Sequence, residues 1–297
     1  METLNVAFQD IIKQAVSLSK TSMVVTEEHV YQIGSKEILP FLDRIIEQLL
    51  LPGSGINGME HLEDLYEKAK TGASCLLLLE HYSNFDLPLF SYLIRKEPER
   101  GADIEDAIVA IAGMKLNEEN PVVAAFTGAY TRLVIYPSRS LQDMDAEKAK
   151  AERARGMAIN HAAMRKLNEV KKLGKLILVF PSGTRYRPWE PSSKKGVREI
   201  DSYIKSFDYM CLVAINGEVL HIRPGDMMDD FVSKDVVRFT VAPVVSCAEF
   251  RMKEREKAES AGIEDKKQAV VDGIMARLEA LHREHERRPA GESNGSA

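Results

Sequence analysis

Residues 75–88 read CLLLLEHYSNFDLP, and this stretch decides the fold. Five consecutive apolar residues, 75–79, are typical of a strand that is buried on both faces of a sheet. The polar residues that follow predict a tight turn and then the start of a helix. A buried strand that turns directly into a helix is the repeating unit of an α/β protein.

Further short apolar runs lie near 108–112, 133–136, 176–180, 211–215 and 236–244. The segments between them have helical composition, which predicts strands that cross over through helices. From Ile38 to Leu50, apolar residues recur instead at three- and four-residue steps, as in a helix. We therefore expect an α/β fold whose mostly parallel sheet has helices on both faces, preceded by a helical N-terminal section. The predicted divisions are a helical section at 1–70, an α/β domain at 71–250, and C-terminal helices with a frayed tail at 251–297.

Composition excludes several classes of protein. The chain has 297 residues, of which 44% are hydrophobic and 29% charged, and its net charge of −5 gives no basic surplus for binding nucleic acid. No apolar run approaches the roughly 18 to 20 residues of a membrane-spanning helix. The first residues lack the basic-then-apolar layout of a secretory signal. We expect a cytoplasmic protein, either free or in peripheral contact with the cytoplasmic face of a membrane.

One segment is basic although the chain as a whole carries a net negative charge. Residues 145–175 hold nine Lys or Arg against four Asp or Glu. Such a segment is either a solvated helix face with paired charges or a docking surface for something anionic, such as lipid headgroups or an acidic carrier protein.

Metal chemistry is weakly indicated. The three cysteines, Cys75, Cys211 and Cys247, lie far apart without the CxxC spacing of a zinc site, so we expect reduced thiols in the core. His282 and His285 stand three residues apart on the last predicted helix but lack a carboxylate-rich neighbourhood, and we expect both to be solvated.

A glycine-rich segment offers a function of another class. Residues 53–58 read GSGING, which satisfies the G-x-G-x-x-G pattern of dinucleotide-binding loops. That pattern requires a strand running into the first glycine, whereas the preceding residues have helical periodicity and end at Pro52. We expect a loop here, with a nicotinamide-dependent oxidoreductase as the alternative.

His81 and Asp86 form an H-x4-D pair just after the predicted strand at 75–79. Open α/β sheets bind ligands at this carboxyl edge. An aspartate brought back onto an imidazole fixes its tautomer and stabilises the imidazolium, so the histidine can act as a general base toward a hydroxyl. The structural alternative is a turn-capping histidine beside a helix-capping aspartate.

A second polar block follows another predicted strand and reads PSGTRYRP at 181–188. Gly183 allows a ligand to approach the backbone closely, and Arg185 and Arg187 carry guanidinium groups that match phosphate oxygens. Arg139 follows a third predicted strand and is expected at the same edge. The block predicts an anion-binding site.

The H-x4-D pair, followed about 100 residues later by FPSGTR at 180–185, resembles the glycerol-phosphate acyltransferase superfamily. The resemblance covers 75–190 and is plausible to about 245. It implies transfer of a fatty acyl group from acyl-CoA or acyl-ACP to a hydroxyl of a glycerol phosphate, in phospholipid biosynthesis, without cofactor or metal. It also implies that His81 is the base, that Asp86 orients it, and that the acceptor is bound by Arg139, Ser182, Gly183, Thr184, Arg185 and Arg187.

Two branches of that superfamily differ in acceptor. Soluble plastid-type glycerol-3-phosphate acyltransferases have Pro-Ser-Gly-Gly-Arg-x-Arg-Pro, similar to 181–188 apart from Thr184, whereas the lysophosphatidate branch has glutamate in place of Ser182. Ser140 replaces a histidine of the plastid type, which leaves part of the acceptor pocket undefined. The resemblance favours glycerol 3-phosphate, with lysophosphatidate as the alternative acceptor and a catalytically silent lipid-binding module as an alternative of another class.

Overall fold

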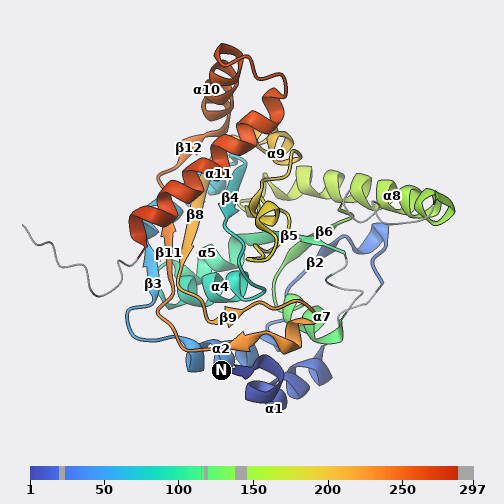
Figure 1. The fold of residues 1–297 in the computed structure, drawn as a ribbon, viewed down its shortest axis with the longest axis vertical. Helices are drawn as coiled ribbons and strands as arrows, with labels where there is room; N and C mark the ends of the chain where they lie inside the picture. Colours follow the sequence, from blue (N-terminus) through green and yellow to red (C-terminus); the bar gives the residue numbers. More distant parts are fainter. Residues whose placement is uncertain (20–23, 115, 117–119, 138–145, 287–297) are drawn as a thin grey trace, which may run out of the picture.

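A computed structural model of the chain describes residues 1–19, 24–114, 116, 120–137 and 146–286. Nine strands of this part form the main sheet (Figure 1). They are β2 (Tyr31–Gln32), β3 (Gly55–Asn57), β4 (Cys75–Leu79), β5 (Ile108–Gly113), β6 (Arg132–Ile135), β7 (Leu176–Val179), β8 (Tyr209–Asn216), β11 (Arg238–Val241) and β12 (Val245–Ser246).

The main sheet is mostly parallel, as predicted. Its order is β2-β6-β5-β7-β4-β8-β11-β3, with β12 also paired to β8. The central strands β6, β5, β7, β4 and β8 are parallel to one another, and β3 is parallel to β11. Antiparallel pairs join β2 to β6 and both β11 and β12 to β8. The strand β4 therefore lies near the middle of a parallel core.

Helices cover both faces, which confirms the predicted fold class. One face is covered by α1 (Leu4–Leu18), α2 (Leu39–Leu49), α3 (Met59–Lys70), α4 (Asp86–Lys96), α5 (Gly101–Ala107) and α7 (Pro121–Thr127). The other is covered by α8 (Ala146–Val170), α9 (Ile200–Ser206), α10 (Cys247–Ser260) and α11 (Lys266–His285). Figure 1 shows α8 reaching outward beside β6 and α11 crossing the sheet near β8.

The strand β4 shows why its sequence is apolar throughout. Cys75, Leu77 and Leu79 pack into the core beneath the first set of helices, whereas Leu76 and Leu78 pack into the core beneath the second. Successive side chains of a strand point to opposite faces, so a strand covered on both sides must be apolar at every position. The run at 75–79 is fully buried and is bounded as predicted.

A smaller sheet holds the first residues of the chain. Its order is β1 (Glu2–Thr3), β10 (Phe231–Val232) and β9 (Leu220–His221), and both pairs are antiparallel. Three short 3-10 helices complete the described elements: η1 (Glu27–His29), η3 (Pro191–Lys194) and η4 (Met227–Asp229). The small sheet joins the N-terminal helix α1 to the segment just before β11.

The N-terminal section is helical, but it also supplies strands that helical periodicity did not predict. The short strands β2 and β3 sit at the two edges of the main sheet. The divisions at residues 71 and 251 stay predictions. Among the helices of the described ranges, none combines the length and the apolarity that crossing a membrane requires.

The glycine-rich segment is not the loop that we expected. Gly55–Asn57 is the edge strand β3, so the strand lies inside the G-x-G-x-x-G pattern instead of before it. Gly58 has a φ of 76°, and a side-chain carbon there would lie 2.4 Å from the carbonyl oxygen of Val241. This glycine serves close packing against β11, and because β3 occupies the pattern, the first two glycines do not form the turn between strand and helix that receives a pyrophosphate.

Candidate functional site

The predicted polar turn lies between β4 and α4. Since β4 and β7 are parallel neighbours, the segments that follow both strands emerge at the same edge of the sheet. His81 follows β4, and its ring stacks on that of Phe180, which follows β7, with ring centroids 3.9 Å apart. The topology thus brings together two segments about 100 residues apart in sequence.

His81 is held by Asp86. Its Nδ1 lies 2.9 Å from Oδ2 of Asp86, and the two side chains are 16% and 4% exposed. The same carboxylate accepts backbone N–H groups from Tyr82 at 2.6 Å and Ser83 at 2.9 Å, and the Ser83 hydroxyl at 2.9 Å. Four donors converge on one buried carboxylate, so both of its oxygens are satisfied by hydrogen bonds.

This arrangement differs from a helix cap. Asp86 is the first residue of α4, and its carboxylate binds N–H groups of the preceding turn, whereas a capping side chain binds N–H groups further along the helix. An ionised carboxylate at Nδ1 places the imidazole proton there and leaves Nε2 as the acceptor. In the described part of the chain, Nε2 of His81 has no hydrogen-bond partner.

The block at 181–188 closes over this turn. Gly183 adopts a φ of 64°, the left-handed region that favours glycine, and donates its N–H to the carbonyl of Phe180 at 2.9 Å. The buried Ser182 hydroxyl donates to the carbonyl of Thr184 at 2.6 Å. Tyr186 donates its N–H to the carbonyl of His81 at 2.8 Å. The block is thus hydrogen-bonded to the residue that carries the imidazole.

The arginines of the block differ in their partners. Arg185 is mostly buried, and its Nη1 lies 3.5 Å from Oδ2 of Asp230. Burial lowers the pKa of Arg185, and Asp230 and Asp86 are the carboxylates that counteract this effect. Arg187 is more exposed; it pairs with Glu190 at 2.8 Å and donates to Oγ1 of Thr184 at 3.4 Å.

The structure therefore brings His81, Asp86, Gly183 and Arg185 to one edge of the sheet, while Arg187 is engaged in a local pair with Glu190. Arg139, together with Ser140, lies outside the described residues. Sequence analysis missed Asp230, which is fully buried and also accepts the N–H of Arg223 at 2.8 Å. Its pairing with Arg185 spans 45 residues and has no local sequence signal.

A cavity of about 560 Å³ opens beside His81. His81, Ser83, Asn84 and Gly183 contribute to its wall, but most of the lining is apolar. The apolar side chains come from α4, β5, α7, β6 and β7, and include Leu87, Ile111, Val123, Phe126, Ile135 and Val179. Binding sites for small ligands typically combine such an apolar wall with a few polar groups, in volumes of about 300–1,000 Å³.

A polar group also lies on this wall. Arg132 is 2% exposed, and its Nη1 donates to the carbonyl of Thr127 at 2.5 Å. Burial lowers the pKa of Arg132 to about 10, so the guanidinium remains charged at neutral pH. The wall of the cavity is thus mainly apolar, with polar groups that include the buried Arg132.

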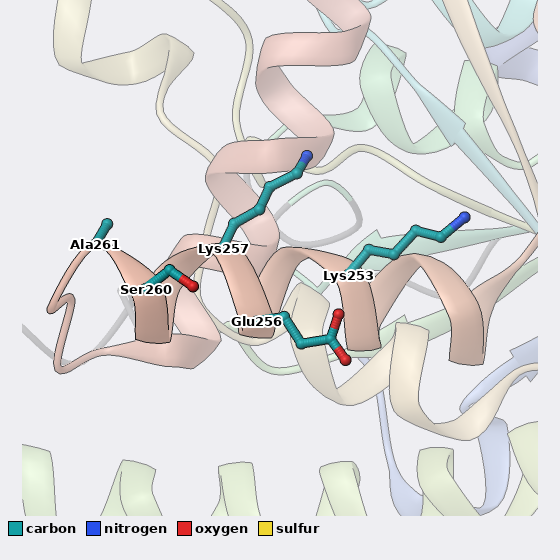
Figure 2. Close-up of a pocket in the computed structure, with 5 residues that line it drawn as sticks. All are labelled: Lys253, Glu256, Lys257, Ser260 and Ala261. Carbon is teal, nitrogen blue, oxygen red and sulfur yellow. The ribbon is translucent and has the colours of Figure 1, made fainter.

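A second hollow lies on α10 and is unrelated to this edge. Figure 2 shows Lys253, Glu256, Lys257, Ser260 and Ala261 along that helix and its end. All five are exposed. The hollow holds no histidine and no buried carboxylate, and it offers no group for chemistry.

The cysteines are buried and unpaired, as expected for packing residues. Burial raises the pKa of Cys75 and Cys247 to about 12, and it also raises that of Cys211. A thiol with so high a pKa is a poor nucleophile at neutral pH because the thiolate is the reactive form. Within the residues that the structure describes, no three His, Cys, Asp or Glu side chains gather as metal ligands.

Two expectations from the sequence need correction. Lys171, from the basic segment, is buried, and its Nζ donates to the carbonyl of Ser206 at 2.7 Å, so it is not a surface charge. His282 is not solvated: its Nδ1 lies 3.0 Å from Oε2 of the buried Glu80, next to His81. His285 is exposed, as expected.

The sequence matches no model of a known protein family. It also matches no curated protein. Among solved structures, the chain is similar to the crystal structure of the 1-acyl-sn-glycerophosphate (LPA) acyltransferase PlsC from Thermotoga maritima, with a TM-score of 0.41 and 15% sequence identity over 93% of this chain and 88% of that one.

Proposed function

We propose that the protein is an acyltransferase that moves a fatty acyl group from an acyl thioester to a hydroxyl of glycerol 3-phosphate, in phospholipid biosynthesis. The observation that carries this proposal is the geometry around His81. Its Nδ1 is bound by the buried Asp86, its ring borders an apolar cavity, and its backbone is bonded to the loop that carries Arg185. A base, an apolar chamber and an anion site are what this reaction needs.

The reaction requires no covalent enzyme intermediate. Nε2 of His81 takes the proton of the acceptor's primary hydroxyl while that oxygen attacks the thioester carbonyl carbon. The tetrahedral oxyanion collapses, the carbon–sulfur bond breaks, and the thiolate takes the proton back from the imidazolium. Asp86 stabilises the imidazolium between these steps. Positioned proton transfer of this kind contributes about 10²- to 10⁴-fold.

Arg185 is the proposed phosphate ligand. Its guanidinium carries several N–H donors, and only Nη1 is used by a partner in the described residues, at the long distance of 3.5 Å from Asp230. A phosphate can therefore bind the remaining donors or replace Asp230. Ser182, Gly183 and Thr184 shape this loop, and Arg187 and Arg139 complete the proposed acceptor site.

The apolar cavity is the proposed site of the acyl chain. It borders His81 directly, so a chain lying in it would bring the thioester carbonyl to the imidazole. The donor is acyl-ACP or acyl-CoA. We propose that the protein acts in the cytoplasm, with α8 and the turn that follows it as the surface that meets an anionic membrane, since Arg153, Arg165 and Lys172 are exposed, as are the apolar Met157 and Leu173.

The test is a transfer assay with purified protein. Glycerol 3-phosphate and lysophosphatidate are each supplied with labelled acyl-CoA and acyl-ACP, and the acylated position of the product is determined. We expect transfer to glycerol 3-phosphate, lost in His81→Ala while the circular dichroism spectrum is retained. Transfer to lysophosphatidate alone would show that lysophosphatidate, and not glycerol 3-phosphate, is the acceptor. Retained activity in the variant would remove His81 as the base.

Absence of transfer with all four combinations of acceptor and donor would reject the proposed acyltransferase activity. A lipid-binding module would then still bind fatty acid in the cavity, which a fluorescent fatty-acid displacement assay detects. A thermal shift with NAD tests the oxidoreductase alternative, for which β3 and Gly58 provide no pyrophosphate turn. We expect no shift with NAD.

A further inference from the structure

A polar cluster built on a buried carboxylate lies next to the proposed base. It consists of Glu80 and Tyr82, the two residues that flank His81, and of His282, near the end of α11. Oε2 of Glu80 lies 3.0 Å from Nδ1 of His282, and the Tyr82 hydroxyl donates to Oε1 of Glu80 at 3.1 Å. The Tyr82 oxygen also lies 3.3 Å from Nδ1 of His282.

Glu80 is a buried carboxylate, 5% exposed, and such a group needs compensation by donors or by positive charge. It accepts the backbone N–H of Ile215 at 2.8 Å, the Tyr82 hydroxyl and Nδ1 of His282. Among the described residues bonded to it, His282 alone can carry a positive charge. The hydrogen bond to Glu80 raises the pKa of His282.

The cluster is fixed on several sides. The carbonyl of His282 accepts the side-chain N–H of Asn216, at the end of β8, at 3.0 Å. Lys194 of η3 forms an ion pair with Glu279 on α11, and its Nζ lies 5.9 Å from the centre of the Tyr82 ring. Among the residues that the structure describes, Glu80, Tyr82, Lys194 and Glu279 are the titratable and charged groups that face His282.

The cluster reaches the proposed catalytic group from both sides in sequence. Glu80 precedes His81 and Tyr82 follows it, so two consecutive peptide units around the imidazole are tied to α11. The Tyr82 ring also packs edge-on against Tyr186, whose N–H binds the His81 carbonyl. The cluster therefore contacts the arginine loop, which has its own hydrogen bonds and the pair of Arg185 with Asp230.

We propose that His282, in its charged form, is a positioning residue that holds His81 in the orientation required for proton transfer, acting through Glu80 and Tyr82. This inference rests on the proposed acyl transfer. Its consequence is that activity needs His282 charged, so that the buried Glu80 stays compensated. Activity should therefore fall at alkaline pH as His282 loses its proton.

The test compares three variants. His282→Ala removes the donor, His282→Gln keeps a donor without titration, and His285→Ala alters an exposed histidine of the same helix as the matched control. We expect His282→Ala to lower kcat at least tenfold with little change in the KM for glycerol 3-phosphate, because the arginine loop remains. His282→Gln keeps a donor but no charge, so its kcat should match the low value that the wild type reaches at alkaline pH, without the alkaline fall that the wild type and His285→Ala show.

A second readout does not depend on activity. The ring nitrogen signals of His81 in a ¹⁵N NMR spectrum report its hydrogen bonding to Asp86, and we expect them to shift in His282→Ala but not in His285→Ala. Unchanged His81 signals together with unchanged kcat would overturn the inference. If the wild type transfers no acyl group, the proposed function fails, and the NMR comparison still decides whether His282 positions His81. If His282→Ala does not fold, His282→Gln carries the pH comparison.

Discussion

Replacing Asp86 by Asn tests the heart of the proposed mechanism, because it removes one charge and almost no volume. The amide oxygen can take the place of Oδ2 and still accept from Tyr82 and from Nδ1 of His81. The amide nitrogen then faces Ser83, whose hydroxyl can rotate to accept from it. We expect the fold to survive, with a loss in the free energy of unfolding of about 1–3 kcal/mol for the disturbed hydrogen bonds.

The loss in rate follows from the charge that disappears. His81 and Asp86 are 16% and 4% exposed, so water screens their interaction weakly. Two unit charges about 4 Å apart at an effective dielectric constant of about 20 attract each other by about 4 kcal/mol. At about 1.4 kcal/mol per factor of ten, the missing stabilisation of the imidazolium lowers kcat by about 10³-fold.

The assay is steady-state acyl transfer to glycerol 3-phosphate, with unfolding followed in urea. Asp106→Asn, at an exposed carboxylate that pairs with Lys36, is the matched control and should retain the wild-type kcat. A folded Asp86→Asn enzyme whose kcat stays within about threefold of the wild type would refute the role of the carboxylate. A similar loss in the control would show that the assay responds to surface charge.

Three further outcomes follow from contacts in the structure. Arg185→Ala should raise the KM for glycerol 3-phosphate at least tenfold with a smaller effect on kcat, and an unchanged KM would remove it from the phosphate site. Lys172→Glu should weaken binding to anionic vesicles at low salt in a sedimentation assay without loss of stability. Lys171→Glu should instead lower the melting temperature, because the ammonium group of Lys171 is buried and donates to a backbone carbonyl. Equal melting temperatures of the two variants would contradict this. The pKa of His282 is raised above 6.5 in the folded chain, so its pairing with Glu80 stabilises the fold below that pH. This contribution to the free energy of unfolding is lost as the pH rises through the folded pKa. Calorimetry should show the loss of stability in the wild type and not in His282→Gln.

The sequence alone determined the central strand, the polar turn and the pairing of His81 with Asp86. These features are local: the apolar run at 75–79 can be buried only between two layers, and a turn of five residues has few ways to bring a carboxylate back onto an imidazole. The predicted strands that became β5, β6, β7, β8 and β11 followed from the same kind of run. Periodicity missed β2 and β3 because strands of two and three residues are too short to show a pattern.

Tertiary structure decided the rest of the site. Asp230 meets Arg185 across 45 residues, and His282 meets Glu80 across 202. Both carboxylates meet their charged partners only through the tertiary fold, and Lys171 looks in sequence like any other charge of a basic helix. Whether such a group is solvated or buried depends on which elements the sheet order places beside it, and short-range patterns do not encode that order. His81 itself could be predicted from the sequence. The residues packed around it, which include the pair of His282 with Glu80, come together only through contacts between distant parts of the chain.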